Sequence, residues 1–239
     1  MCRLDSAGER VRNVSSPHPD DGSDDTARHA LVAAGIKLAA GGFVVGSAGN
    51  LSCRHGDRVV ITATGAELGN MTIDDTVVVN LAGLQVAGTR RPSSELPLHL
   101  GIYNRRPGDV GAIAHAHALA STAVSCVVRG QLPTLHYASA ELGGPPRIAP
   151  YATFGTDQLA VNVLEALGDD RSAALMQNHG SVAVGATLTE AIARLELLEW
   201  ICQLHQVAHQ LGRPRVLDPD ELRLAGEALL ARRQQIDLA

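Results

Sequence analysis

The chain contains 239 residues, carries a formal net charge of −5 and is poor in aromatic residues, at 3%. This length suffices for one full hydrophobic core, so we expect a single domain. The mild charge and the lack of a basic block argue against nucleic acid or an anionic membrane as the main partner. No apolar run is as long as a membrane span and the four cysteines are scattered, so we expect a cytoplasmic protein with reduced thiols.

The chain begins with a polar segment and then alternates predicted helices and strands. Residues 1–24 are rich in Asp, Ser and Pro, which predicts a disordered leader before a domain that spans residues 25–239. Hydrophobic spacing and capping signals predict helices over 25–40, 94–105, 118–128, 157–167, 187–211 and 218–233. Runs of apolar residues predict strands over 58–62, 77–79, 84–86, 112–117, 133–137, 174–177 and 181–185. The strands between residues 58 and 86 are expected to form an antiparallel meander.

Two histidines, His115 and His117, follow a run of small apolar residues in a predicted strand. Because side chains two residues apart point to the same side of a strand, both imidazoles are expected on one face of the sheet. A third histidine, His179, follows another predicted strand. Neutral imidazole is a common metal ligand, so the three histidines indicate a metal site. From spacing alone, the alternative is that one of the first two is a surface residue and the other a hydrogen-bonded core residue.

Segments of small residues upstream of these histidines have a composition suited to binding an anion. In Gly46–Ser52 and Ala63–Gly65, small side chains let the backbone approach a ligand closely, although ordinary glycine-rich turns have the same composition. In Ser93-Ser94-Glu95, Ser94 is the predicted N-cap of a helix. Two adjacent hydroxyls at a helix N-terminus suit a phosphate, whereas Glu95 taken alone is explained as a first-turn acid favoured by the helix dipole.

The remaining histidines carry weaker signals. His205 and His209 lie one helical turn apart in a predicted helix. They lack the glutamate of the His-Glu-x-x-His metalloprotease helix, so we interpret them as a helix face. His99 and His136 are candidates to support the site residues through hydrogen bonds.

Six short motifs follow one another along the chain: Ser47-Ala48-Gly49-Asn50-Leu51-Ser52, Ile61-Thr62-Ala63-Thr64-Gly65, Ser93-Ser94-Glu95, His115-Ala116-His117, Ala149-Pro150-Tyr151-Ala152-Thr153-Phe154-Gly155-Thr156 and Asn178-His179-Gly180. In this order they resemble the class II aldolase/adducin family, and within it the zinc-dependent L-fuculose-1-phosphate aldolases. The resemblance extends from about residue 27 to about residue 211.

This resemblance implies a single α/β domain with three layers, in which a central, mainly antiparallel sheet lies between two layers of helices. It also implies a fourfold-symmetric homotetramer with its active sites at subunit interfaces. The implied activity is the zinc-dependent cleavage of a phosphorylated ketose, such as L-fuculose 1-phosphate, to dihydroxyacetone phosphate and an aldehyde. Manganese and cobalt are the alternatives to zinc.

Carried over to this sequence, the resemblance assigns His115, His117 and His179 as the zinc ligands. Glu95 would be the catalytic acid/base, and Tyr137 a second catalytic residue near the aldehyde end of the site. The resemblance also gives a wall residue, Phe154, and a set of residues that would hold the substrate phosphate, which are Gly49, Asn50, Thr64, Gly65, Ser93 and Ser94.

One feature departs from the family pattern, and other activities of the family share the same histidines. The aldolases use a C-terminal tyrosine of the neighbouring subunit, but no tyrosine follows Tyr151 here. The resemblance therefore does not decide which aldehyde the site takes, nor which substrate. The alternatives are sugar-phosphate 4-epimerases, decarboxylases of oxidised sugar acids and a dehydratase of a methylthio sugar phosphate. The epimerases have Asp where this chain has Glu95, which favours an aldolase. A non-enzymatic adducin-like module is disfavoured because such modules lack the metal histidines.

Overall fold

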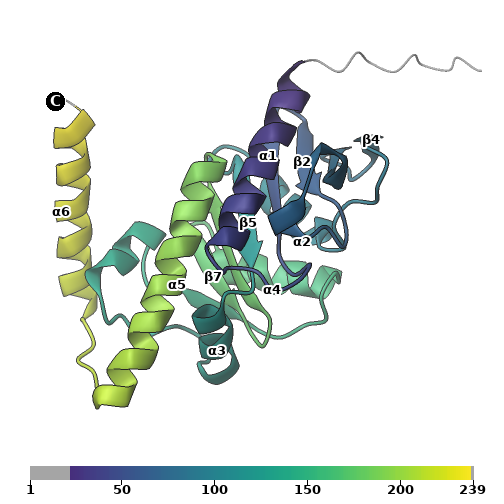
Figure 1. Ribbon diagram of the computed structural model, residues 1–239. Helices are drawn as coiled ribbons and strands as arrows, with labels where there is room; N and C mark the ends of the chain where they lie inside the picture. Colours follow the sequence, from purple (N-terminus) through teal and green to yellow (C-terminus); the bar gives the residue numbers. More distant parts are fainter. Residues whose placement is uncertain (1–21, 238–239) are drawn as a thin grey trace, which may run out of the picture.

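In the computed structural model, which describes residues 22–237, eight strands form one sheet (Figure 1). In spatial order they are β4 (Gln85–Ala87), β3 (Thr76–Asn80), β2 (Arg58–Thr62), β1 (Asn50–His55), β5 (Ala112–Ala116), β8 (Gly180–Gly185), β7 (Ala173–Met176) and β6 (Arg147–Ala149). All neighbouring strands run antiparallel except β7 and β6, which are parallel. The sheet is therefore mainly antiparallel, as expected.

Helices cover both faces of the sheet. The helices of the described chain are α1 (Gly22–Ala40), α2 (Leu96–Arg105), α3 (Leu119–Val127), α4 (Asp157–Leu167), α5 (Leu188–Leu211) and α6 (Pro219–Asp237), with short 3-10 helices η1 (Leu68–Asn70), η2 (Ile73–Asp75) and η3 (Tyr137–Leu142). One face packs against α2 and α4, and the other against α1, α3 and α5. In Figure 1, α1 and α5 lie in front of the strands. The expected three-layer α/β/α architecture is confirmed.

The alternation of side chains along the strands divides the core between the two faces. In β2, Val59 and Ile61 pack on the face covered by α2 and α4, whereas Val60 packs on the opposite face. All three side chains are fully buried. Burial of one such side chain stabilises the fold by about 1.5–3 kcal/mol. The same alternation decides which side chains of β1 and β5 face α2, and it therefore determines the position of the site.

Two of the predicted helix starts are confirmed by their caps. The Thr156 hydroxyl accepts a hydrogen bond from the Leu159 amide at 3.3 Å, at the start of α4. The Thr187 hydroxyl accepts one from the Glu190 amide at 3.2 Å, at the start of α5. A cap of this kind contributes about 1 kcal/mol.

One strand predicted from the sequence is wrong, and one strand at the centre of the sheet was not predicted. Residues 133–137 are not a strand. Pro133 has no backbone N–H to donate, and the Thr134 carbonyl accepts a hydrogen bond from the Leu217 N–H ahead of α6. Conversely, Asn50–His55 forms β1 at the centre of the sheet, although its composition predicts a small-residue loop. Pairing with β2 on one side and β5 on the other overrides its weak strand propensity.

The first helix begins at Gly22, three residues before its predicted start at residue 25. Asp24 in its first turn is buried and pairs with Arg58 of β2 at 2.5 Å, which attaches the start of α1 to the sheet. Residues 1–21, which make up most of the predicted leader, lie outside the described residues. At the other end of the chain, α6 lies against η3 at the edge of the molecule (Figure 1).

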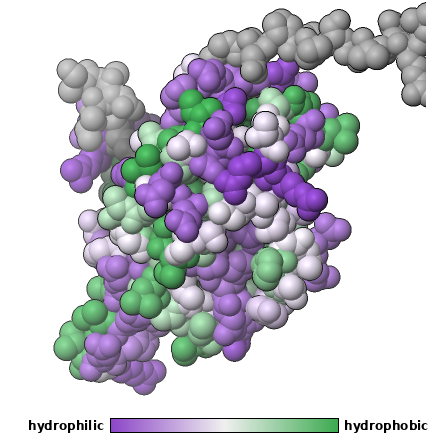
Figure 2. All heavy atoms as spheres, turned by 45° about the vertical axis from the view of Figure 1, so that its right-hand side comes forward, coloured by the Kyte–Doolittle hydropathy of each residue, from purple (hydrophilic) through white to green (hydrophobic). Residues whose placement is uncertain are grey.

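Hydrophilic and hydrophobic residues are interspersed on the face shown in Figure 2. Within residues 22–237, no helix combines the length and the apolar character needed to cross a membrane.

Candidate active site

The two histidines of the His-x-His motif lie at the C-terminal end of β5, on the sheet face that α2 covers. His115 shares this face with Ile113, and His117 follows directly after the strand. Their Nε2 atoms are 3.0 Å apart. The ring of His179, in the turn between β7 and β8, has its centroid 4.9 Å from that of His115 and 4.8 Å from that of His117. The structure thus brings together three histidines from two separate parts of the chain.

Local backbone contacts aim these rings at one another. The Nδ1 atom of His115 lies 2.9 Å from the Ser181 carbonyl oxygen, to which it donates, so that Nε2 is the nitrogen that faces the cluster. The residue before His179 is Asn178, with φ at 52°, and it is the one described non-glycine residue with positive φ. Asparagine tolerates this left-handed conformation better than most residues, and the turn it makes directs His179 back toward β5.

Glu95 faces the three histidines from the start of α2. It occupies the N-cap position that the sequence assigned to Ser94, and its carboxylate makes no capping bond. Its Oε2 atom lies 3.1 Å from His115 Nε2, and its Oε1 atom lies 3.5 Å from His179 Nε2. The backbone amide of Glu95 donates to the Ser93 hydroxyl at 3.2 Å, which helps to fix this turn. The carboxylate has therefore turned away from its helix and into the site.

The electrostatics of the cluster favour positive charge beside Glu95. Burial acts to raise the pKa of Glu95, but the attraction of His115 and His179 and a hydrogen bond from Asn50 hold it below its ordinary value. Burial acts to lower the pKa of His115, but the Glu95 carboxylate raises it overall. Burial and the repulsion of the neighbouring imidazoles lower the pKa of His117 and of His179 to about 4. Glu95 is thus an anion, and His117 and His179 are neutral at physiological pH.

These groups fit a divalent cation. The candidate ligand atoms of His115, His117 and His179 all lie within 4.8 Å of one another. The Glu95 Oε1 atom is buried and has no hydrogen-bond partner within the described chain, which is costly for a carboxylate oxygen. A cation among the three imidazoles would compensate that oxygen. Three imidazole ligands with a fourth position open are typical of catalytic zinc.

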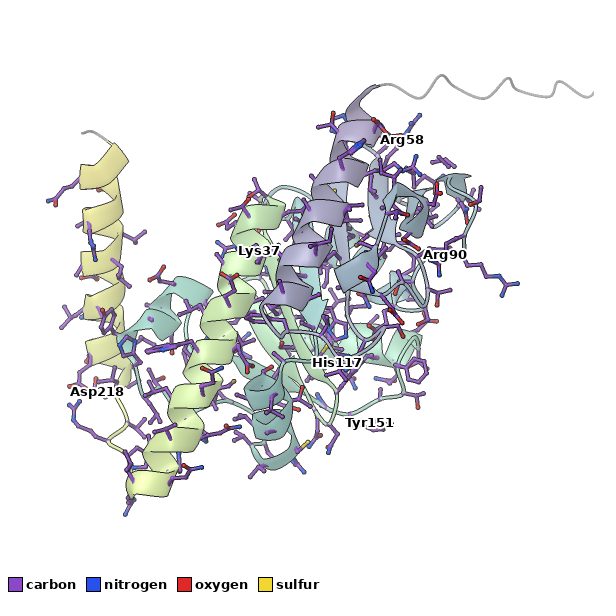
Figure 3. The ribbon with its side chains drawn as sticks, in the orientation of Figure 1. Lys37, Arg58, Arg90, His117, Tyr151 and Asp218 are labelled. Carbon is purple, nitrogen blue, oxygen red and sulfur yellow. The ribbon has the colours of Figure 1, made fainter. Side chains whose placement is uncertain are left out.

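A cavity of about 550 Å³ opens in front of the cluster, a size suited to a small ligand. His117, His179 and Glu95 line one part of it. All of the candidate phosphate residues line it as well, namely Gly49, Asn50, Thr64, Gly65, Ser93 and Ser94. Its described lining contains no Lys or Arg, so an anion there would be held by hydroxyls, amides and the N-terminal end of α2. Tyr151 also lines the cavity, and Figure 3 shows it near His117 at one end of the sheet.

Comparison with known proteins identifies the family. The family model of the class II aldolase and adducin N-terminal domain matches residues 29–206. The chain belongs to the class II aldolase/adducin family. It is 38% identical over 202 residues to a 5-methylthioribulose-1-phosphate/5-deoxyribulose-1-phosphate aldolase from Rhodospirillum rubrum, covering 84% of this chain and 90% of that protein. It is 37% identical over 181 residues to the L-fuculose phosphate aldolase of Escherichia coli K12, covering 75% of this chain and 82% of that protein.

Solved structures agree with the sequence relatives. A structure of an L-fuculose 1-phosphate aldolase matches with a TM-score of 0.80 at 35% identity, covering 85% of this chain and 96% of that one. Relatives with aldolase names together with the family match make this chain an enzyme, a lyase of the class II aldolase type. The expected family and fold are therefore confirmed.

Tyr137 lies apart from the cavity of this class II aldolase chain. It stands at the start of η3, is half exposed and is not among the residues that line the cavity. Its ring is tilted against that of His136, with centroids 4.2 Å apart, and Trp200 contacts His136 edge-on at 4.8 Å. Within one chain, Tyr137 therefore belongs to a surface cluster of rings and does not contact the three histidines.

Several residues at the site were not identified from the sequence. Val45 and Tyr151 line the cavity as largely exposed apolar side chains, although both stand outside the expected site set. The Asn50 side chain donates a hydrogen bond to Glu95 Oε2 at 2.8 Å, a contact that its assignment to the phosphate did not anticipate. Such a contact joins residues that are 45 positions apart, so no local pattern reveals it.

Gly49 offers a test of how closely the backbone must pack beside the three histidines. Its φ is +91°, and a Cβ atom there would lie 2.9 Å from the His115 carbonyl oxygen. Gly49→Ala should lower the free energy of unfolding by about 2–4 kcal/mol, because the left-handed conformation and the backbone clash add together. Gly42→Ala is the matched control, since Gly42 has φ +76° and a Cβ atom added there would have no atom within 4 Å beyond its own residue and its two chain neighbours.

The control substitution should cost only about 1–2 kcal/mol, from backbone conformation alone. Urea unfolding of both variants measures the difference. Equal losses in the two variants would show that the approach of Gly49 to β5 is not tight.

Proposed function

We propose that this class II aldolase uses a divalent metal, with zinc preferred, to cleave a ketose 1-phosphate to dihydroxyacetone phosphate and an aldehyde. The observation that carries the proposal is that two kinds of group line one cavity. One is the anionic Glu95 carboxylate with His117 and His179, which cluster with the buried His115, and the other is a set of hydroxyls, backbone amides and the N-terminal end of α2, with no Lys or Arg in the described lining. A sugar with both a carbonyl and a phosphate has the matching chemistry.

His115, His117 and His179 would hold the metal through their Nε2 atoms. Bound there, a divalent cation would supply Lewis-acid stabilisation of the negative charge that develops on the ketose oxygens as the carbon–carbon bond breaks. Zinc is preferred because three neutral imidazoles with an open position are its usual catalytic ligand set. The hydrogen bond from His115 Nδ1 to the Ser181 carbonyl would keep that ring in the required tautomer.

Glu95 would move the proton. Cleavage between C3 and C4 of the ketose takes a proton from the C4 hydroxyl and returns one to C3 of the three-carbon fragment. The lowered pKa of Glu95 keeps it ionised, so the unprotonated carboxylate is the form that would meet the substrate. Its Oε1 atom is the one without a hydrogen-bond partner among the described residues, whereas Oε2 is held by Asn50, so Oε1 would carry the proton.

The phosphate would bind at the small-residue end of the cavity. Gly49 and Gly65 have φ of +91° and +67°, which lets the backbone approach a ligand without a side chain in between. Ser93 and Ser94 lie at the N-terminal end of α2, where the helix dipole favours an anion. Binding energy at this remote group would orient the reacting carbon atoms beside Glu95.

The far end of the substrate would be apolar. Val45 and Phe154 line the cavity, and their side chains are 73% and 66% exposed, which leaves apolar surface available for a ligand. The relative from Rhodospirillum rubrum acts, by its name, on ribulose 1-phosphates that end in a methylthio group or a deoxygenated C5. We therefore propose a substrate of that type in preference to L-fuculose 1-phosphate.

The assembly is also part of the proposal. A homotetramer with sites at subunit interfaces would allow Tyr137 of one chain to reach the cavity of the next. Its position outside the cavity of its own chain and its half-exposed ring are compatible with such a role.

A substrate panel tests the reaction. The zinc-loaded enzyme is incubated with 5-deoxyribulose 1-phosphate, 5-methylthioribulose 1-phosphate, L-fuculose 1-phosphate, each sugar without its phosphate, and an oxidised sugar acid. We expect release of dihydroxyacetone phosphate from the phosphorylated ketoses, fastest from the 5-deoxy compound. Faster reaction of a sugar acid would favour the decarboxylase, and inversion at C4 without release of dihydroxyacetone phosphate would favour the epimerase. Elimination of water from the methylthio sugar phosphate would favour the dehydratase.

The phosphate assignment predicts a change in KM. Thr64→Val removes one hydroxyl from the cavity lining at nearly constant volume, and it should raise KM for the phosphorylated ketose by about 10-fold to 100-fold with kcat little changed. The variant should keep its metal, since Thr64 lies away from the histidines in the proposed site. Thr89→Val is the control, because Thr89 is exposed and outside the cavity lining. An unchanged KM for Thr64→Val would remove that hydroxyl from the phosphate site.

A further inference from the structure

Two rows of polar side chains meet between α2 and β1 behind the cavity. Glu95, His99 and Tyr103 are spaced by four residues, so they share one side of α2. Asn50 and Ser52 are spaced by two, so they share the face of β1 that α2 covers. His99, Ser52 and Tyr103 are fully buried in a layer that is otherwise apolar.

These side chains form one unbroken line of hydrogen bonds. The Tyr103 hydroxyl lies 2.8 Å from Ser52 Oγ, and Ser52 Oγ lies 2.6 Å from His99 Nδ1. The Nε2 atom of His99 lies 2.5 Å from Asn50 Oδ1. Asn50 Nδ2 donates to Glu95 Oε2 at 2.8 Å. The line therefore begins in the core at Tyr103 and ends on the carboxylate in the site.

The anionic end gives the line its direction. A carboxylate only accepts hydrogen bonds, so the amide nitrogen of Asn50 must face Glu95 and its oxygen must face His99. His99 Nε2 must then be the donor to that oxygen. Burial lowers the pKa of His99 to about 3, so the ring is neutral and its Nδ1 atom accepts from Ser52. Ser52 in turn accepts from the Tyr103 hydroxyl.

Without the Nε2–H donor of His99, no group on the core side of Asn50 would favour its amide oxygen over its amide nitrogen. A flipped amide would place its oxygen 2.8 Å from the Glu95 carboxylate, where two acceptors repel. A buried group left unpaired in this way costs about as much as a lost hydrogen bond, and the carboxylate would shift to relieve it. The geometry of Glu95 thus depends on a histidine that does not line the cavity.

We propose that His99 is a positioning residue, whose Nε2–H orients the Asn50 amide so that Asn50 holds Glu95 Oε2 beside His115 and leaves Oε1 beside His179. Ser52 and Tyr103 support it by fixing which nitrogen of His99 carries the proton. The consequence for catalysis rests on the proposed role of Glu95 in proton transfer. The hydrogen-bond direction is a separate claim that needs no substrate.

A matched pair of variants tests the catalytic consequence. In His99→Gln, the side-chain amide nitrogen can take the place of Nε2 and donate to Asn50, whereas in His99→Asn the shorter amide reaches only the place of Nδ1. We expect His99→Gln to keep kcat within about 3-fold of the wild type and His99→Asn to lower it by about 10-fold to 100-fold. Both variants should keep one metal per chain, which elemental analysis checks.

A residue that only packs in the core would give a different result. If His99 acts only through packing, both variants should have a lower melting temperature, and the shorter Asn should lower it more. The kcat of the two variants, measured per folded and metal-loaded chain, should then be the same. Equal kcat per folded, metal-loaded chain in both variants would overturn the positioning role.

The second measurement uses the wild-type protein and no substrate. With 15N-labelled histidine, long-range 15N–1H spectra identify which ring nitrogen carries the proton. We expect His99 to be neutral with its proton on Nε2 throughout the range from about pH 5 to pH 8. A proton on Nδ1 would overturn the proposal even if both variants failed to fold. If Nε2 carries the proton but no ketose phosphate is cleaved, the proposed function fails and the orientation of Asn50 stands.

Discussion

Glu95→Gln should retain the fold and the metal but lower kcat for ketose 1-phosphate cleavage by about 100-fold to 10,000-fold. Glutamine has nearly the same shape as glutamate and can still accept the hydrogen bond from Asn50 through its oxygen. It cannot take up the proton from the substrate, which is the step assigned to the carboxylate. Steady-state kinetics with elemental analysis of the same preparation measures both quantities.

Glu196→Gln is the matched control for this change. Glu196 pairs with Lys37 on the surface at 3.0 Å, and its side chain is 41% exposed. Such an exposed pair contributes about 1 kcal/mol or less, so this variant should match the wild type in both rate and metal content. Cleavage at a near-normal rate by Glu95→Gln would remove Glu95 from the mechanism.

His117→Ala should lose most of the bound metal and, with it, at least about 1,000-fold of the activity. His117 contributes one of three imidazoles, its ring is 4.9 Å from that of His115, and only two protein nitrogens would remain. Two imidazoles make a poor zinc site, because the usual catalytic set has three protein ligands. Elemental analysis of the purified variant should find far less than one metal per chain.

His209→Ala is the control for this loss. His209 lies on α5, its Nδ1 atom contacts the His205 carbonyl at 2.8 Å, and it is outside the three-histidine cluster. It should retain the full metal content. A full complement of metal in His117→Ala would show that the ligands are misassigned.

The parts of the fold and site that follow a local period could be predicted from the sequence. The two-residue spacing of His115 and His117 predicts that both rings lie on one sheet face. Ile113, two residues before His115, packs with the residues of α2, which shows which face it is. The caps at Thr156 and Thr187 fixed the starts of α4 and α5 because an N-cap depends on neighbours three residues away. In each case the deciding interaction lies within a few residues.

The parts that depend on distant pairing could not be predicted. The strand β1 has weak strand propensity and forms because β2 and β5 flank it. The contact between Asn50 and Glu95 joins two elements, and neither segment signals it alone. The four-residue spacing of Glu95, His99 and Tyr103 is present in the sequence. It does not predict the line of hydrogen bonds by itself, because the partners Ser52 and Asn50 lie on another element.

The most direct test of a catalytic metal in this aldolase is the metal dependence of 5-deoxyribulose 1-phosphate cleavage by the full chain. The purified enzyme is treated with a chelator, dialysed and assayed for release of dihydroxyacetone phosphate before and after one equivalent of zinc is added. We expect almost no release without metal and recovery of most of the original rate with zinc, in parallel with the metal content. Full activity in the stripped protein, or no release from any ketose 1-phosphate in the zinc-loaded protein, would contradict the assignment of the three histidines to a catalytic metal in an aldolase.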